Sequence, residues 1–385
     1  MTASEPDRPL RVLHVLGDVR DLGNGIVNAA VDLACAEVAA GHEVWVASLG
    51  GEFEPLLARN GVTHLLLDQT RTAGKIAGAA ARLRRLTSRL NVDVVHAHMV
   101  TALVLAQLVR PFGIRFLVVA TVHTDFNRGS QLMALADLVI TVSESNRRSL
   151  LARRFPAGRV RTVLNGTVGS PRRGGFPVPA VLERPALVTV AGLYHRKGLV
   201  ELVAAVAQLR NRGVAAHLYL VGEGPDRADI EAAVAAKGLG ERVHFEGFHP
   251  DPRPWLLGSD VFVLVSRREP FGLAVVEARE AGCAVVVSDV DGFSEALSGG
   301  RAGQLVPVGD VPALATVLQR LLTDAEELAA WRAAAGQDLA ALSVTRVADD
   351  TLRAYREALT ERRRCWSASR RRAPDRGHGR GIRGT

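Results

Sequence analysis

Short apolar runs alternate with longer stretches of helical periodicity through most of the chain. The mostly apolar run 12–16 is followed by segment 26–40, which has apolar residues at helical spacing and ends at Gly41, a common helix stop. The later runs are apolar on both faces, which is typical of parallel strands covered by helices on both sides. This pattern predicts a doubly wound α/β domain in the first half. Its other expected strands are 44–47, 65–67, 92–95, 116–121 and 138–142, and its other helices are 75–90, 101–109 and 144–154.

The alternation stops between Gly169 and Pro185 and then starts again. This stretch holds four prolines and three glycines and has no apolar period, which indicates an interdomain linker. We therefore expect two Rossmann-like domains that face a cleft, which is where open parallel sheets bind ligands. In the second half, strands are expected at 187–191, 217–221, 243–245, 261–265 and 285–288, and helices at 199–210, 225–237 and 273–281. The expected organisation is a first domain at 1–168, the linker at 169–185, a second domain at 186–342, a helix at 343–360 that crosses back to the first domain, and a basic, disordered tail at 361–385.

Charge and composition remove several classes of protein. The net charge is +8, but residues 361–385 contribute +7 from nine arginines and two acids, so residues 1–360 are nearly neutral. A nucleic-acid enzyme is expected to carry positive charge on its folded body, so we do not expect nucleic-acid binding. We also expect neither a transmembrane helix nor a secretory signal. The three cysteines are far apart in the sequence, which favours a reduced, cytoplasmic setting.

The most informative segment is Glu-Pro-Phe-Gly-Leu-Ala-Val-Val-Glu at 269–277, which follows an expected strand and opens a helix. Glu269 precedes the helix, whereas Glu277 lies within it, where a carboxylate can accept hydrogen bonds from two neighbouring hydroxyls of a sugar. A glutamate pair at this spacing is common by chance, so the interpretation depends on the Pro-Phe-Gly run and on the two-domain context. The start of the helix also offers backbone N–H groups that attract anions, those of Phe271, Gly272 and Leu273.

With these features the chain resembles the retaining glycosyltransferases of family 4, which have the two-domain glycosyltransferase B (GT-B) fold. The family's hallmark is a glutamate pair separated by seven residues with Pro-Phe-Gly after the first, and Glu269 and Glu277 match it in spacing and context. The resemblance extends from Arg11 to about Tyr355. It implies that Glu269 orients the hydroxyls of the transferred sugar and that Glu277 binds the ribose of a nucleotide-sugar donor.

Segment 191–198 is similar to the family's strand-to-helix turn that binds the donor's diphosphate. Lys197 matches a cation of that turn, but Gly192 occupies the position of the family's arginine, so Arg196 is our candidate for the second cation. A solvated charge pair at the start of a helix is the alternative. The next turn resembles the family's Gly-x-Gly-Pro turn, which implies donor contacts at Gly222 and Gly224.

Two segments of the first half also resemble parts of the family's cleft. The turn after the first strand contains Gly23 and Gly25, separated by Asn24 where the family has a glycine pair, and a purely structural turn is the alternative. His123 lies in a loop that contacts the donor sugar in relatives, although a buried structural histidine is the alternative.

Two further groupings suggest a metal, and we reject both. His96 and His98 end a strand, but no third ligand is recognisable nearby, so we interpret them as structural residues of the cleft wall. Asp289 and Asp291 have the D-x-D spacing of metal-dependent glycosyltransferases of another fold. They lie where family 4 has a loop that borders the donor site without a metal, and Glu295 of that loop is a weaker site candidate.

The resemblance implies a metal-independent, retaining transfer from a nucleoside diphosphate sugar, with UDP- or GDP-sugars favoured and no cofactor required. The acceptor hydroxyl would attack from the side of the leaving group, and cations would stabilise the departing diphosphate. We expect the acceptor to be a glycan, a glycolipid or a small metabolite. A catalytically silent relative that binds nucleotide-sugars, or an epimerase or hydrolase on the same fold, is the alternative. The candidate catalytic residues are Glu269, His123, Lys197 and Arg196, and the candidate donor-binding residues are Glu277, Lys197, Arg196, Gly23, Gly25, Gly222, Gly224, Phe271, Gly272 and Leu273.

A row of arginines on the expected helix 75–90 raises the question of membrane contact. Arg82, Arg85 and Arg89 are spaced by three and four residues and so share one face. Such a face can dock on anionic lipid, which would place the protein at the inner face of the membrane. A solvated face is the commoner explanation.

Overall fold

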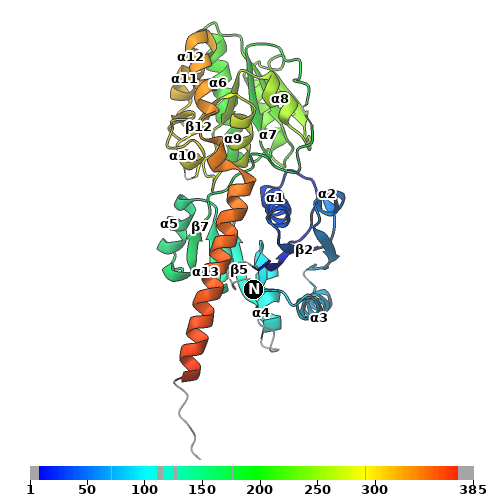
Figure 1. Cartoon of the computed structure of the whole chain (residues 1–385). Helices are drawn as coiled ribbons and strands as arrows, with labels where there is room; N and C mark the ends of the chain where they lie inside the picture. Colours follow the sequence, from blue (N-terminus) through cyan, green and yellow to red (C-terminus); the bar gives the residue numbers. More distant parts are fainter. Residues whose placement is uncertain are drawn as a thin grey trace, which may run out of the picture.

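The computed structural model describes residues 8–70, 72–110, 116–124, 128–175, 177–290 and 292–371. They form two α/β units, one at each end of the molecule in Figure 1, each built on one parallel sheet. This arrangement confirms the fold class expected from the sequence. The two sheets have the same strand order for their first six strands, so the same topology occurs twice in the chain.

The first sheet has the strand order β3-β2-β1-β4-β5-β6-β7. All its strands are parallel, but the chain adds β2 and β3 on one side of β1 and β4 to β7 on the other, so the strand order reverses between β1 and β4. Helices α3 and α4 cover one face of the sheet and α1 covers the other, and each face buries its own apolar cluster. Such a reversal leaves a crevice at the carboxyl ends of the two strands, where ligands bind. The elements are β1 Arg11–Val15, α1 Gly25–Ala39, β2 Glu43–Ser48, α2 Glu54–Arg59, β3 Thr63–Leu66, α3 Ala73–Leu90, β4 Val94–Ala97, α4 Val100–Val109, β5 Leu117–Val122, β6 Leu138–Thr141, α5 Glu144–Ala152 and β7 Val160–Thr162.

The second sheet has the order β10-β9-β8-β11-β12-β13 and reverses between β8 and β11. The sequence pattern missed β13, as it missed β7, because both are edge strands of three residues. It also missed α11, although Asp310 caps this helix with a side-chain hydrogen bond to Ala313 N and a proline follows in the first turn. The elements are β8 Ala186–Val190, α6 Leu199–Asn211, β9 His217–Val221, α7 Arg227–Ala236, β10 Val243–Gly247, α8 Arg253–Gly258, β11 Val261–Leu264, α9 Leu273–Glu280, β12 Ala284–Ser288, α10 Phe293–Ala296, β13 Gln304–Val306, α11 Val311–Thr323 and α12 Ala325–Ala335.

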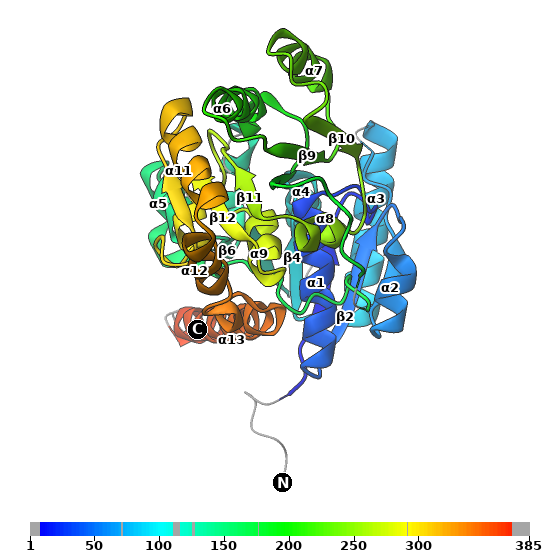
Figure 2. The ribbon, with the colours of Figure 1, turned by 90° about the horizontal axis from the view of Figure 1, so that it is seen from above.

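The last helix, α13 (Val344–Arg371), crosses back from the second unit to the first, as expected. It lies against α1, and Leu352 and Tyr355 are buried in the cluster beneath that helix (Figure 2). The helix continues past residue 360, where we expected it to end, because no glycine or proline interrupts the arginine-rich segment before Pro374 and arginine is a good helix former. The rest of the expected tail, 372–385, lies outside the described residues.

Within the described part of the chain, no helix combines the length and the hydropathy that crossing a membrane requires. On α3, the side chains of Arg82, Arg85 and Arg89 are all exposed.

Candidate functional site

A cleft of about 1050 Å³ lies between the two units, beyond the carboxyl ends of their strands. Its walls come from the loops after β1, β5, β8, β9 and β11 and from the start of α9. The structure brings the twelve residues named as candidate catalytic or donor-binding residues to this cleft: Gly23, Gly25, His123, Arg196, Lys197, Gly222, Gly224, Glu269, Phe271, Gly272, Leu273 and Glu277.

An ion pair lies at the point where the second sheet reverses direction. Lys197 ends the loop after β8 and Glu269 lies in the loop after β11, and Lys197 Nζ is 2.5 Å from Glu269 Oε2. Only 12% of the lysine side chain and 13% of the glutamate side chain are exposed. The pair therefore places in the cleft a cation and a carboxylate that neutralise each other and that can each bind a ligand group of opposite charge or polarity.

The start of α9 lies beside this pair. Gly272 precedes the helix with φ +93°, and a Cβ at this position would lie 2.4 Å from the ring of Phe293, so the turn requires glycine. Among the described residues, no acceptor takes a hydrogen bond from the backbone N–H of Gly272 or Leu273. These N–H groups at a helix N-terminus can bind an anion or a sugar hydroxyl.

Arg196 lies next to Lys197 and is held by an aromatic ring. Its guanidinium carbon is 5.5 Å from the centroid of the Tyr194 ring, within the range of a cation–π contact. A Cβ at Gly192, the position of the family's arginine, would lie only 2.7 Å from that ring. Tyr194 therefore occupies the space beside Gly192 and positions Arg196, which carries the second positive charge of this loop.

The two glycines of the turn after β9 have a structural role that the sequence did not indicate. A Cβ at Gly222 would lie 2.0 Å from the carbonyl oxygen of Ala191, and one at Gly224 would lie 2.3 Å from that of Leu193. This turn therefore packs directly against the backbone of the loop that carries Arg196 and Lys197. Both glycines also line the cleft.

Sequence reasoning missed a pair of arginines in the linker. Arg173 Nη2 lies 2.5 Å from Glu277 Oε1, each side chain being 11% exposed, and Arg173 also pairs with Glu280. Arg172 binds Asp32 of α1 through two hydrogen bonds of 2.9 Å. Both arginines line the cleft, and the only signal for them was two adjacent cations inside a Pro- and Gly-rich linker.

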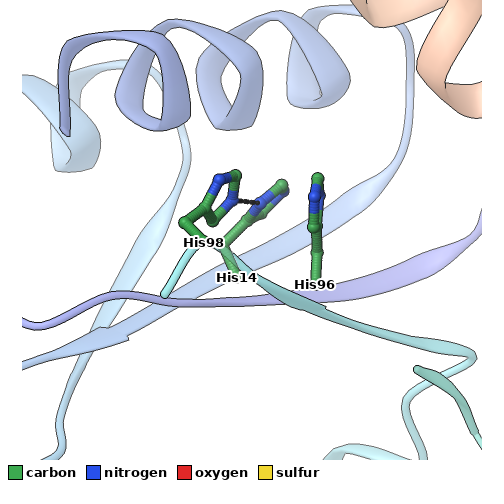
Figure 3. Close-up of side chains that lie close together, drawn as sticks. All are labelled: His14, His96 and His98. Carbon is green, nitrogen blue, oxygen red and sulfur yellow. Dashed lines mark hydrogen bonds between the residues drawn. The ribbon is translucent and has the colours of Figure 1, made fainter. Parts of the chain in front are cut away.

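The reversal point of the first sheet contains a group of histidines. His14 of β1 and His96 of β4 are register partners, and His14, His96 and His98 lie side by side (Figure 3). His96 and His98 are buried and absent from the cleft lining, so the prediction that they form its wall was wrong. The missing third histidine, His14, could not be found from local spacing because β1 and β4 are far apart in the sequence.

The nitrogens of His14, His96 and His98 are all within 4.8 Å of one another, a spacing that could hold a metal ion. Each of their ring nitrogens, however, already has a hydrogen-bond partner. Burial, together with the neighbouring histidines, lowers the pKa of His96 and of His98 well below the usual value. The arrangement is therefore that of a hydrogen-bonded network of histidines, of which His123 is the cleft-facing member.

Two contacts join the units beside the cleft. The Ser143 hydroxyl donates to the carbonyl oxygen of Pro270 at 2.7 Å. The Glu295 carboxylate accepts from the backbone N–H groups of Glu144 and Ser145 at 2.7 and 2.8 Å, at the start of α5. Glu295 therefore joins the two units in this structure, and it is not among the residues that line the cleft. Asp291, of the same loop, lies outside the described residues.

Comparison with known proteins agrees with the fold and the motifs. Residues 184–324 match the family described as "Glycosyl transferases group 1", and residues 23–167 match "Glycosyltransferase Family 4". Over 91% of the chain, the fold superposes on a glycosyltransferase from Rickettsia africae ESF-5 with a TM-score of 0.75 at 18% identity, covering 99% of that chain. The molecule is thus a GT-B protein. The chain belongs to the family 4 glycosyltransferases.

Curated relatives match only in part. The lipopolysaccharide core biosynthesis glycosyltransferase LpsE of Rhizobium meliloti (strain 1021) is 31% identical over 41% of this chain and 45% of the relative. The 2-deoxystreptamine glucosyltransferase of Streptomyces kanamyceticus is 34% identical over 48% of this chain and 51% of the relative. The chain thus spans about half the length of the curated relatives that it matches. Anabaena HepE, solved in complex with UDP-glucose, has the same fold with a TM-score of 0.73 at 19% identity over 91% of this chain and 99% of that one.

Proposed function

We propose that the protein transfers a sugar from a nucleoside diphosphate sugar to a hydroxyl group, with retention of the anomeric configuration and without a divalent metal. The observation that carries this proposal is the ion pair of Lys197 and Glu269 at the reversal point of the second sheet, beside the N–H groups at the start of α9 that have no acceptor in the described part of the chain. A diphosphate matches the lysine, Arg196 and the N–H groups, whereas sugar hydroxyls match the carboxylate.

The chemistry follows from where charge develops. Breaking the bond between sugar and diphosphate leaves negative charge on the leaving phosphate, which Lys197 and Arg196 would stabilise in place of a metal ion. Glu269, released from the lysine, would accept hydrogen bonds from the sugar. Glu277 would do the same for the ribose, provided that the donor displaces Arg173 from it. The acceptor hydroxyl would attack on the face of the leaving group, which retains the configuration.

The comparisons favour particular partners for this reaction. A neighbour of the same fold holds UDP-glucose, which supports UDP-sugars as first donors to test. Relatives named for lipopolysaccharide core and for 2-deoxystreptamine support an acceptor with several hydroxyls, either a glycan or a small cyclic alcohol. The exposed arginine face of α3 would supply contact with anionic lipid if the acceptor is lipid-linked.

The test is a transfer assay with UDP- and GDP-sugars in the presence of a chelator. We expect the product to have the same anomeric configuration as the donor, α or β. The rate of transfer should be unchanged by the chelator and should be lost in Lys197→Ala. Donor binding without any turnover, against every acceptor class tried, would instead support the silent relative. Release of free sugar, or conversion of the donor to its epimer, would support the hydrolase or epimerase.

A further inference from the structure

A continuous row of hydrogen bonds runs from the cleft into the core of the first unit. His123 Nε2 lies 3.1 Å from His98 Nδ1, and His98 Nε2 lies 3.0 Å from His14 Nδ1. His14 Nε2 lies 2.8 Å from Glu37 Oε2 on α1. The side chains of His14 and Glu37 are completely buried, whereas His123 lines the cleft. The row therefore connects the cleft to a carboxylate that solvent does not reach.

The chemistry of the end group fixes the direction of the row. A carboxylate in its ionised form only accepts hydrogen bonds, so in that form of Glu37 the donor is Nε2 of His14. A neutral imidazole has one N–H, so Nδ1 of His14 accepts from His98, and Nδ1 of His98 accepts from His123. All three rings then carry their proton on Nε2. His123 presents a bare Nδ1, which has no hydrogen-bond partner among the described residues.

We propose that Glu37, His14, His98 and His123 form a proton relay that takes up one proton from a hydroxyl group in the cleft. The proton adds to Nδ1 of His123, while the Nε2 proton of His123 moves to Nδ1 of His98 and that of His98 moves to Nδ1 of His14. His14 ends as an imidazolium beside the Glu37 carboxylate, and the hydroxyl oxygen keeps the electron pair of its O–H bond. The assignment of this hydroxyl to the sugar acceptor rests on the proposed function. The relay itself is inferred from the hydrogen bonds alone.

The inner end of the row is the favourable place for the proton. Burial lowers the pKa of His123 to about 4, and burial with neighbouring histidines lowers that of His98 well below normal, so neither ring holds a charge alone near neutral pH. At His14 the charge lies beside the Glu37 carboxylate, which also interacts with the Tyr355 hydroxyl. A proton added at His14 is therefore next to the carboxylate that ends the row.

Four titratable groups outside the row lie near it: His96, Tyr355, His42 and Arg356. His96 Nε2 lies 2.6 Å from Thr121 Oγ1, and His96 Nδ1 lies 2.6 Å from the Tyr355 hydroxyl oxygen. Burial and the Glu37 charge raise the pKa of Tyr355 well above normal, so it stays protonated. His42, whose pKa is lowered by burial and by Arg356, lies near enough to Glu37 for their charges to interact. None of these groups bonds to a ring nitrogen of the row. His96 packs against His98, with the ring centroids 4.2 Å apart, so His96→Phe serves as a control that keeps an aromatic ring there and leaves the hydrogen bonds of the row in place.

The test follows the tautomer and charge of each ring by long-range ¹H–¹⁵N spectra of the full chain, without ligand, during an acid titration. In the wild type we expect His123 to change from the Nε2–H to the Nδ1–H neutral tautomer while His14 becomes the imidazolium. In Glu37→Gln the amide can donate as well as accept, so both tautomers of His123 should appear at neutral pH. The midpoint of proton uptake should also fall by about one to two pH units because the buried charge is gone.

Two phenylalanine variants separate the relay from a purely structural role. His98→Phe interrupts the row, so His123 should itself become the imidazolium on acidification, whereas His96→Phe should leave the spectrum of His123 as in the wild type. The proposal is overturned if wild-type His123 becomes the imidazolium, or if the two variants change it alike. If His98→Phe does not fold, Glu37→Gln, which keeps the shape of the side chain, decides the matter.

A turnover measurement addresses the step that depends on the proposed function. Glu37→Gln should lower kcat by about 100-fold, within the usual range for the loss of a general base, and leave the KM for the donor nearly unchanged. Unchanged kcat together with the expected spectra would show that the relay exists but does not serve sugar transfer. The ligand-free spectra thus test the relay even if the protein transfers no sugar.

Discussion

The two sheets have the same strand order up to the sixth strand, yet their reversal points contain opposite kinds of chemistry. Between β8 and β11 the loops carry charges, Lys197 and Glu269, that line the cleft. Between β1 and β4 the strands themselves carry histidines, His14 and His96, that are buried in the core. The topology therefore sets where functional groups gather, and the residues at the strand ends decide whether they handle anions or protons.

The largest effect should come from removing the cation at the second reversal point. Lys197→Ala should lower kcat by about 100- to 1000-fold, because the leaving diphosphate loses a positioned positive charge. The assay is sugar transfer at saturating donor. Lys237→Ala, outside the cleft, is the control and should behave as the wild type, and an active Lys197→Ala enzyme would contradict the role given to this lysine.

The next largest effect should be the decrease in the free energy of unfolding of the first unit as the pH falls. The folded-state pKa of His96 is lowered from 6.5 by burial, so the unfolded chain binds a proton below about pH 6.5 that the folded chain does not. The stabilisation from keeping His96 neutral is complete above that pH and is lost as the pH falls. We expect the free energy of unfolding in urea to decrease by about 1.4 kcal/mol per pH unit for this ring alone.

The variant His96→Phe checks this assignment. It should reduce the slope of unfolding free energy against pH by about that amount, because its aromatic ring binds no proton. The lost hydrogen bonds to Thr121 and Tyr355 shift the whole curve and leave its slope unaffected. An unchanged slope would mean that other groups cause the acid sensitivity.

A smaller effect is expected at the linker. Arg173→Met removes the cation that pairs with Glu277 and Glu280. We expect the free energy of unfolding, measured in urea, to fall by about 1–3 kcal/mol. Arg173→Lys keeps the charge and should recover most of the loss. Equal stability of the methionine variant and the wild type would show that the cleft solvates Glu277 well enough without the arginine.

The smallest effect should be at the contact between the units. Glu295→Ala removes the acceptor for two N–H groups at the start of α5, which should cost about 1 kcal/mol. It should also increase the radius of gyration of the ligand-free protein in small-angle X-ray scattering. Glu326→Ala, on the exposed side of α12, should leave the radius unchanged. An identical radius in both variants would show that Glu295 does not hold the units together.

Sequence reasoning was most successful where a site is contained in one short segment. Lys197, Glu269 and Gly272 each lie in a loop between a strand and a helix, and such loops can be located from apolar periodicity and a local motif. The fold class followed from the same periodicity, because both sheets consist of apolar parallel strands.

The parts that the sequence did not reveal depend on contacts between distant segments. His14 and His98 become neighbours only through the pairing of β1 with β4, and Glu37 joins them only because α1 covers that face of the sheet. Arg173 binds Glu277 across the junction of the linker and the second unit. No spacing in the sequence encodes these distances, so the proton relay and the arginine contact required the three-dimensional structure.

The most direct test of the account is the thermal stability of the protein with UDP-, GDP- and ADP-sugars, measured without metal. A ligand that binds only the folded state adds about 2.7 kcal/mol at a hundred times its Kd, which gives a clear rise in Tm. We predict that one nucleotide series stabilises the wild type and that Lys197→Ala abolishes the rise. If no nucleotide-sugar raises the Tm at millimolar concentration, or if Lys197→Ala responds like the wild type, the assignment of the donor site between β8 and β11 is contradicted.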